Sequence, residues 1–191
     1  MIVKRLASEI SYNIDNSTPD IYYQPQYDNK GNCIGAEALF RWNHNYYGTI
    51  YPPLVFKIAE ESDTLKRLEM LVFKTVFNDM ERLTGILGSE AKISINATGY
   101  IIQDNDFYEF LKEIKSQYPE YCTNNIMIEV TEQAYLNIDD EFMNKLKRIH
   151  DLGFKLGIDD FSMGSTSIKY ARRSRMLSIS GIFIQSCYSF R

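Results

Sequence analysis

Acid and amide side chains recur inside short apolar segments of the sequence, and these side chains could bind divalent metal ions. They are Glu37, Asn96, Glu129 and the adjacent pair Asp159-Asp160. A carboxylate in a buried strand is costly unless it is paired or bound to a cation. Oxygen ligands suit hard ions such as Mg²⁺ or Mn²⁺, and two such ions could activate water and stabilise a phosphorane-like transition state. The sequence therefore predicts a metal site built from oxygen ligands.

A simpler interpretation applies to each of these acids taken alone. One acid in a strand is more often a salt-bridge partner or an edge residue than a metal ligand. The hypothesis of a metal site depends on four strands each offering an acid or an amide near its end.

The segments that must position these side chains alternate between strand and helix patterns. Strand patterns cover residues 21–27, 33–42, 92–98, 126–131, 155–161 and 178–184, and helical patterns cover 2–14, 54–61, 64–84, 104–117, 139–152 and 167–173. Turn-forming residues 28–32 predict that the first two strands form a hairpin. The later alternation is typical of either a (β/α) barrel or a doubly wound sheet, and both place working groups at the carboxyl ends of strands. No Gly-rich phosphate loop follows a strand, which disfavours the nucleotide-binding sheets.

Bulk composition excludes several classes of protein. The 191 residues carry a net charge of −4, so we expect no binding to a nucleic acid polymer. Cys33, Cys122 and Cys187 are scattered, which predicts neither a disulfide framework nor a zinc site and favours a reducing compartment. No apolar run approaches the ~20 residues of a membrane span, and residues 1–12 do not read as a signal peptide. We expect a cytoplasmic protein without membrane insertion.

Several segments resemble the motifs of the EAL domain family, in the family's order. Gly35 to Trp42 reads GAEALFRW and resembles GAEALLRW, the motif that names the family. The other similar segments are Tyr23-Gln24-Pro25-Gln26 (YQP), Gly48 to Glu60 (loosely spaced), Ser94-Ile95-Asn96 (SVN), Ile128 to Glu132 (EITE) and Leu152 to Phe161 (LG followed by DDFG). The resemblance covers about residues 20–184.

The resemblance implies a metal-dependent enzyme of bacterial second-messenger signalling. It implies an α/β fold, a TIM-like (β/α) barrel whose first strand is antiparallel, and hydrolysis of cyclic di-GMP to linear pGpG. The expected cofactors are two Mg²⁺ or Mn²⁺ ions. By position, Glu37, Asn96, Glu129 and Asp159 would bind the first ion and Asp160 the second. Glu37 and Asp160 would also be catalytic.

The resemblance assigns further residues to the loop and the nucleotide. Glu132 would be a third catalytic-site residue, because it would hold the loop after Asp160. Gln24, Leu39 and Arg41 would contact cyclic di-GMP, and Arg41 would donate to a phosphate. A surface role for Arg41 and a helix-capping role for Glu132 are the simpler alternatives. Domains of this family often pair, so the resemblance is compatible with a homodimer.

The sequence departs from the family near its end. Ser162 and Ser165 replace a glycine and a tyrosine of the loop after the acidic pair, and Ser178 and Ser180 stand where the family has Lys and Asp. A hydroxyl supplies no ammonium charge and is a weaker metal ligand than a carboxylate. We therefore expect weak turnover at best.

The sequence also stops at Arg191, before the strands that end the family's motif series. We expect residues 1–191 to be a single domain, with residues 1–19 as a helical lead-in and about six of the eight barrel strands present. The alternatives to an enzyme are an inactive module that binds cyclic di-GMP or a protein partner, and a non-functional fragment.

Overall fold

The computed structural model describes residues 2–16, 19–131, 139–158 and 177–179. The strands are β1 (Asp20–Tyr27), β2 (Cys33–His44), β3 (Gly48–Ile50), β4 (Lys92–Ala97), β5 (Ile126–Val130), β6 (Lys155–Ile158) and β7 (Leu177–Ile179). The helices are α1 (Ile2–Asn16), α2 (Pro52–Glu61), α3 (Leu65–Leu87), α4 (Gly99–Gln103), α5 (Asn105–Gln117), α6 (Glu120–Asn125) and α7 (Asp140–Asp151). The predicted strands and helices that fall within the described residues are present, with ends that differ by a few residues. The predicted helix over 167–173 and the last residues of the predicted strands 155–161 and 178–184 lie outside the described residues.

The strands form one sheet in the order β1-β2-β4-β5-β6-β7, and β3 pairs with β2. β1 runs antiparallel to β2, whereas each neighbouring pair from β2 to β7 along this order is parallel. Parallel pairing requires the chain to cross back between strands, and from β2 to β6 the described helices lie within these crossings. The predicted antiparallel first strand and the α/β fold class are confirmed.

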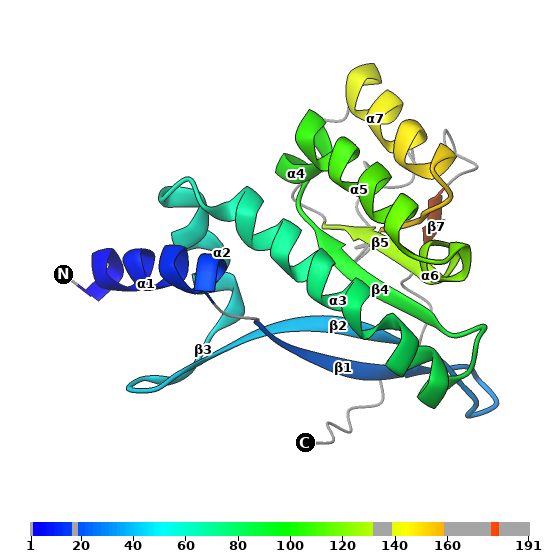
Figure 1. Ribbon diagram of the computed structural model, residues 1–191, viewed down its shortest axis with the longest axis horizontal. Coiled ribbons are helices and arrows are strands. Elements are labelled where there is room, and N and C mark those ends of the chain that lie inside the picture. Colours follow the sequence, from blue (N-terminus) through cyan, green and yellow to red (C-terminus); the bar gives the residue numbers. More distant parts are fainter. Residues whose placement is uncertain (1, 17–18, 132–138, 159–176, 180–191) are drawn as a thin grey trace.

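Helices α3, α5 and α7 lie along one side of the sheet, as Figure 1 shows, and the main core lies between them and the strands. Buried side chains at this interface are Ile93, Ile95, Ile126 and Ile128 from the strands and Phe73, Phe107 and Phe142 from the helices. Burial of such large apolar side chains supplies the main favourable free energy of folding. This layer therefore fixes the strands whose opposite face carries the candidate site.

A smaller apolar cluster packs α1 and α2 around the start of α3. Leu6 and Ile10 on α1 are buried, as are Val55, Ile58 and Leu68. Leu6 and Ile10 are four residues apart on α1, and with the partly buried Ala7 and Ile14 they form the apolar face that meets the cluster. The predicted helix over residues 2–14 is thus held in the structure by packing of this face.

Three short elements, β3, α4 and α6, were not predicted. Each has at most six residues, which is too short to show a clear hydrophobic period. α4 starts at Thr98, whose side-chain oxygen accepts the Ile101 N–H at 3.3 Å. The sequence pattern predicts a strand through Thr98, whereas the structure ends the strand at Ala97 and uses Thr98 as the N-cap of a helix.

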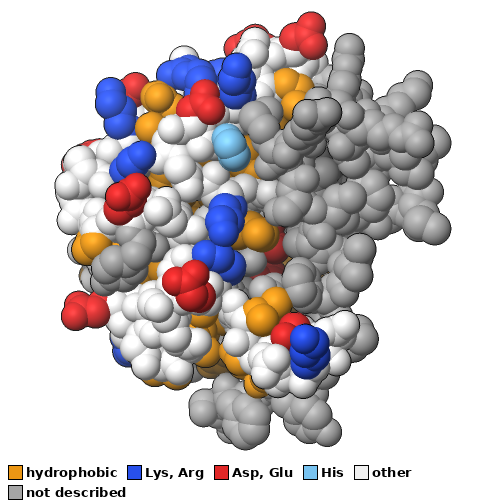
Figure 2. All heavy atoms as spheres, turned by 90° about the vertical axis from the view of Figure 1, so that its right-hand side faces the viewer, with side chains coloured by type: hydrophobic (Ala, Val, Ile, Leu, Met, Phe, Trp, Pro, Cys, Tyr) orange, Lys and Arg blue, Asp and Glu red, His pale blue; other side chains and the backbone are white. Residues whose placement is uncertain are grey.

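The described surface carries both signs of charge. Figure 2 shows Lys and Arg side chains interspersed with Asp and Glu on one face of the molecule. Among the described helices, none combines the length and apolar character needed to cross a lipid bilayer.

Candidate functional site

The face of the sheet opposite the helices carries polar side chains. Successive side chains of a strand point to opposite faces, so Ile95 enters the core and Asn96 faces the other way. The same alternation separates Ile128 from Glu129, and Ala38 from Glu37. Asn96 and Glu129 are direct partners across β4 and β5. Glu37, Asn96 and Glu129 therefore come from three neighbouring strands of one face.

A hydrogen bond joins two of these predicted ligands. Asn96 Nδ2 donates to Glu37 Oε1 at 2.8 Å. The other amide atom, Asn96 Oδ1, is buried, and the described residues place no hydrogen-bond donor on it. A buried acceptor without a donor is costly and indicates that a group is needed there. A cation would meet this need, since an amide oxygen is an acceptable ligand for a hard ion.

Glu129 lies deeper in the sheet than its two neighbours. Only 2% of it is exposed, whereas Glu37 and Asn96 are half-buried. Its register partner on the neighbouring strand β6 is Gly157. A Cβ atom at residue 157 would lie 3.2 Å from Glu129 Cγ and 3.1 Å from Met127 Sδ. The missing side chain thus leaves the space that the Glu129 side chain occupies.

The three residues predicted to contact the nucleotide lie on β1 and on the C-terminal half of β2. Gln24 is the direct partner of Glu37 across the antiparallel pair, which places them side by side. Leu39 and Arg41 follow Glu37 at two-residue intervals and share its face. Arg41 Nη1 donates to the Phe40 carbonyl at 2.8 Å, and its guanidinium lies 5.7 Å from the centre of the Tyr22 ring. The structure therefore brings all three close to the strand that carries Glu37.

The remaining predicted site residues, Glu132, Asp159 and Asp160, lie outside the described residues, as does Ser180. Within the part of the chain that the structure describes, no three His, Cys, Asp or Glu side chains gather. The described part of the site is two carboxylates and an amide. Asn96, Glu129 and Gly157 are successive register partners on β4, β5 and β6. Ser178 on β7 is the register partner of Gly157 and continues this row.

One buried carboxylate beside the site was missed in the sequence. Glu69 on α3 is 2% exposed and accepts hydrogen bonds from Thr98 at the end of β4. The signal was its place in the helical repeat, four residues after Leu65 and three before Val72, both of which are buried. A glutamate on the apolar side of a helix predicts a buried polar contact.

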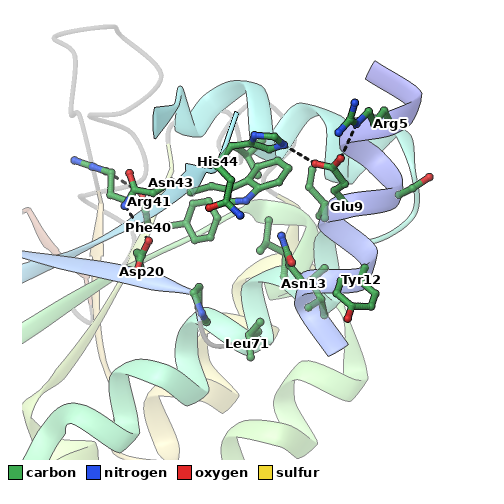
Figure 3. Close-up of a pocket in the computed structure, with 18 of the residues that line it drawn as sticks. Arg5, Glu9, Tyr12, Asn13, Asp20, Phe40, Arg41, Asn43, His44 and Leu71 are labelled. Carbon is green, nitrogen blue, oxygen red and sulfur yellow. Dashed lines mark hydrogen bonds and ion pairs between the residues drawn. The ribbon is translucent and has the colours of Figure 1, made fainter. Parts of the chain in front are cut away.

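A cavity of about 750 Å³ is lined by residues of α1 and of the C-terminal half of β2. Figure 3 shows it between α1 and the strand, with Phe40 directed into it and the Arg41 side chain directed away from α1. His44 Nε2 and Glu9 Oε2, 2.6 Å apart, close one end. Arg41 lines its edge, but Gln24, Glu37, Leu39, Asn96 and Glu129 do not. Among the described site residues, the cavity therefore shares only Arg41 with the predicted site.

Comparison with known proteins identifies similar chains. The protein family described as "EAL domain" matches residues 7–181. The "Probable cyclic di-GMP phosphodiesterase PdeG" of Escherichia coli (strain K12) is 27% identical over 158 residues, which are 82% of this chain and 31% of that protein. The "Cyclic di-GMP phosphodiesterase PdeR" of the same organism is 28% identical over 162 residues, 84% of this chain and 24% of that protein.

A solved structure, "PaMucR Phosphodiesterase, c-di-GMP complex", has the same fold. Its TM-score is 0.81 at 21% identity, and the match covers 92% of this chain and 71% of that one. This chain thus spans about a third or less of the length of the two curated relatives. At such low identity the structural match speaks for the fold alone.

Proposed function

This chain belongs to the EAL domain family, and from that premise we propose that it binds cyclic di-GMP and hydrolyses it to linear pGpG with divalent metal ions. The observation that carries the proposal is the hydrogen bond of 2.8 Å between Asn96 and Glu37, beside the buried carboxylate of Glu129. These three side chains come from neighbouring strands and offer oxygen atoms on one face of the sheet. Homology to cyclic-di-GMP phosphodiesterases supports the choice of substrate.

The described residues fit a hard divalent ion. Glu37, Asn96 and Glu129 would hold it, and the buried Oδ1 of Asn96 would gain the partner that the described residues do not provide. Asp159 would complete the ligands of this ion, and Asp160 would bind a second one. A bound Mg²⁺ or Mn²⁺ supplies positive charge to the phosphate oxygens and makes water more acidic.

The chain's own residues would orient the nucleotide. Arg41 would exchange its hydrogen bond to the Phe40 carbonyl for one to a phosphate oxygen, since a charged acceptor makes a stronger bond. Gln24 would contact the nucleotide beside Glu37, and Leu39 would give it an apolar surface. In the reaction, water adds to one phosphorus atom while the bond from that phosphorus to the ribose oxygen breaks, and the ribose oxygen takes a proton. Glu132 would hold the loop after Asp160.

A second function, binding without hydrolysis, has one observation in its favour. Ser178 occupies the row of Asn96, Glu129 and Gly157, at the place where the resemblance expects a lysine. A serine hydroxyl brings no positive charge to the phosphate, as a lysine ammonium would, so metal and nucleotide could bind while turnover is slow.

The test is a hydrolysis assay with purified chain, cyclic di-GMP and Mn²⁺, in which chromatography follows the linear product. The control is Glu37→Gln, which keeps the shape of the side chain and removes its charge. We expect the control to be at least about 100-fold slower, because loss of even an indirect metal contact costs 10–100-fold. Equal rates would refute hydrolysis by this chain.

Calorimetric titration of cyclic di-GMP in Ca²⁺, which replaces the catalytic ion, separates the two functions. Heat of binding without product would establish the binding module. The absence of both heat and product from folded protein would refute both functions.

A further inference from the structure

Glu69 is an unusual residue for its position on α3. Most buried residues of this helix are apolar. The other buried polar residue of α3 is Thr75, whose hydroxyl donates to the Leu71 carbonyl of the same helix at 2.8 Å. Glu69 instead reaches another element. Burial raises the pKa of Glu69 to about 7, although the hydrogen bonds from Thr98 act in the opposite direction. A carboxyl group this far from water is costly, so its contact with Thr98 must offset a real penalty.

Both carboxylate oxygens of Glu69 are used on a single residue. Oε1 accepts the main-chain N–H of Thr98 at 2.8 Å, and Oε2 accepts its side-chain hydroxyl at 2.9 Å. The Thr98 oxygen in turn accepts the Ile101 N–H, which starts α4. Thr98 is therefore fixed at its main chain and at its side chain, between the end of β4 and the first turn of the next helix.

Asn96 lies two residues before this fixed point. Among the described residues, its side chain makes one hydrogen bond, to Glu37, and its buried oxygen would face the expected ion. A further main-chain bond, from Thr131 N–H to the Ala97 carbonyl at 3.1 Å, holds the same turn to the strand end of β5. A shift of Thr98 would therefore move the Asn96 side chain relative to both carboxylates.

We propose that Glu69 is a positioning residue for the candidate site, which holds Thr98 from α3 and thereby sets the place of Asn96 among the metal ligands. The proposal rests on the proposed function for the role of Asn96. Glu69 bonds Thr98 and would act without contacting the nucleotide or the metal. Its effect would pass through the main chain at the end of β4.

The experiment compares Mn²⁺ affinity across four variants of the whole chain, measured by calorimetry. Glu69→Leu removes both hydrogen bonds at similar volume, and Thr98→Val removes only the hydroxyl. Thr98→Ser keeps the hydroxyl and tests rescue. Thr75→Val is the matched control, because it removes a buried hydroxyl from the same helix, and the described partner of that hydroxyl lies within the helix.

We expect Glu69→Leu to weaken Mn²⁺ binding by about tenfold or more, as is usual when a residue that orients a metal ligand is lost. Thr98→Val should weaken binding less, and Thr98→Ser and Thr75→Val should bind like the original chain. A merely structural role predicts a lower melting temperature with unchanged affinity. Unchanged affinity in folded Glu69→Leu, or in Thr98→Val if Glu69→Leu does not fold, overturns the proposal.

A metal-free measurement separates this inference from the proposed function. In EDTA, the ¹⁵N–¹H signals of the Asn96 side-chain amide, assigned by their loss in Asn96→Asp, report its hydrogen bond to Glu37. We expect these signals to shift in Glu69→Leu and Thr98→Val and to stay in place in Thr75→Val. Shifted signals without any Mn²⁺ binding by the original chain would overturn the metal site but keep Glu69 as the residue that places Asn96. Unshifted signals would overturn the positioning role itself.

Discussion

Asn96 shows why an amide suits a position between two carboxylates. An amide offers a donor and an acceptor without net charge. The donor bonds Glu37 at 2.8 Å, and no donor from the described residues meets the acceptor, an oxygen that a cation could use. A third carboxylate at this place would repel its neighbours whenever no ion is bound.

The substitution Asn96→Asp tests this reasoning. In EDTA we expect the free energy of unfolding to fall by about 1–3 kcal/mol, because the hydrogen bond to Glu37 is replaced by a contact between like charges. Added Mn²⁺ should recover most of the loss. Thermal melting monitored by circular dichroism measures both effects.

The control for this substitution is Asn29→Asp. It makes the same change of net charge in the exposed turn between β1 and β2, where the change in stability should stay within about 0.5 kcal/mol. If the two variants melt alike in EDTA, the contact between Asn96 and Glu37 has no special weight.

Individual residues of the site were predictable where their type is unusual for their surroundings. Glu37, Asn96 and Glu129 were predicted because polar residues stand out in apolar strands, and the structure brings them onto one face. Gly157 was not predicted, since its importance is the absence of a side chain next to Glu129. Glu69 was hidden in the helical repeat of α3. The helical repeat indicates that Glu69 is buried, but its partner Thr98 and the neighbour of Gly157 come from distant segments, which a local pattern does not show.

At the scale of elements, the pairing of β2 with β4 depends on close approach of two main chains. A Cβ atom at Gly35 would lie 2.1 Å from the Lys92 carbonyl oxygen, which is main chain and cannot swing aside. Gly35 precedes Glu37 by two residues and lies on the same strand. The glycine of the GAEALFRW segment thus has a structural reason of its own.

We predict opposite effects for two glycine-to-alanine substitutions. Gly35→Ala should lower the free energy of unfolding by about 2–4 kcal/mol, because it forces β2 and β4 apart. Gly85→Ala lies on α3, where an added Cβ meets nothing within 4 Å. It should raise stability by about 0.5–1 kcal/mol, since alanine is the better helix former.

Urea unfolding of both glycine variants measures these changes. A Gly35→Ala variant as stable as the original chain would contradict the close packing of the two strands.

Long elements were predictable and short ones were not. The helical repeat predicted α3, α5 and α7, because each presents several turns of apolar residues to the sheet. The hairpin of β1 and β2 followed from the turn residues between them. β3 is a separate strand of three residues that follows the second strand. Its pairing with Trp42, Asn43 and His44 is what defines it as a strand. Such pairing is tertiary information.

At the scale of the whole molecule, ligand binding and folding are linked. An ion that binds only the folded chain raises its stability by RT ln(1 + [ion]/Kd), which is about 2.7 kcal/mol at a hundredfold excess over Kd. For a chain of this size the melting temperature should rise by roughly 5–10 °C. The site spans strands from β2 to β5, so its ligands come together only when the sheet is formed.

We therefore predict that Mn²⁺ raises the melting temperature of the original chain and that cyclic di-GMP raises it further. Glu37→Gln should lose most of the Mn²⁺ effect, whereas Gly85→Ala should keep it, because that residue lies on the far side of the sheet layer. A rise of equal size in Glu37→Gln would mean that Mn²⁺ binds elsewhere. A rise with Mn²⁺ but none with the nucleotide would leave the metal site standing and count against Gln24, Leu39 and Arg41 as a nucleotide surface. Because stability reports binding and not turnover, the result holds whether or not Ser178 permits hydrolysis.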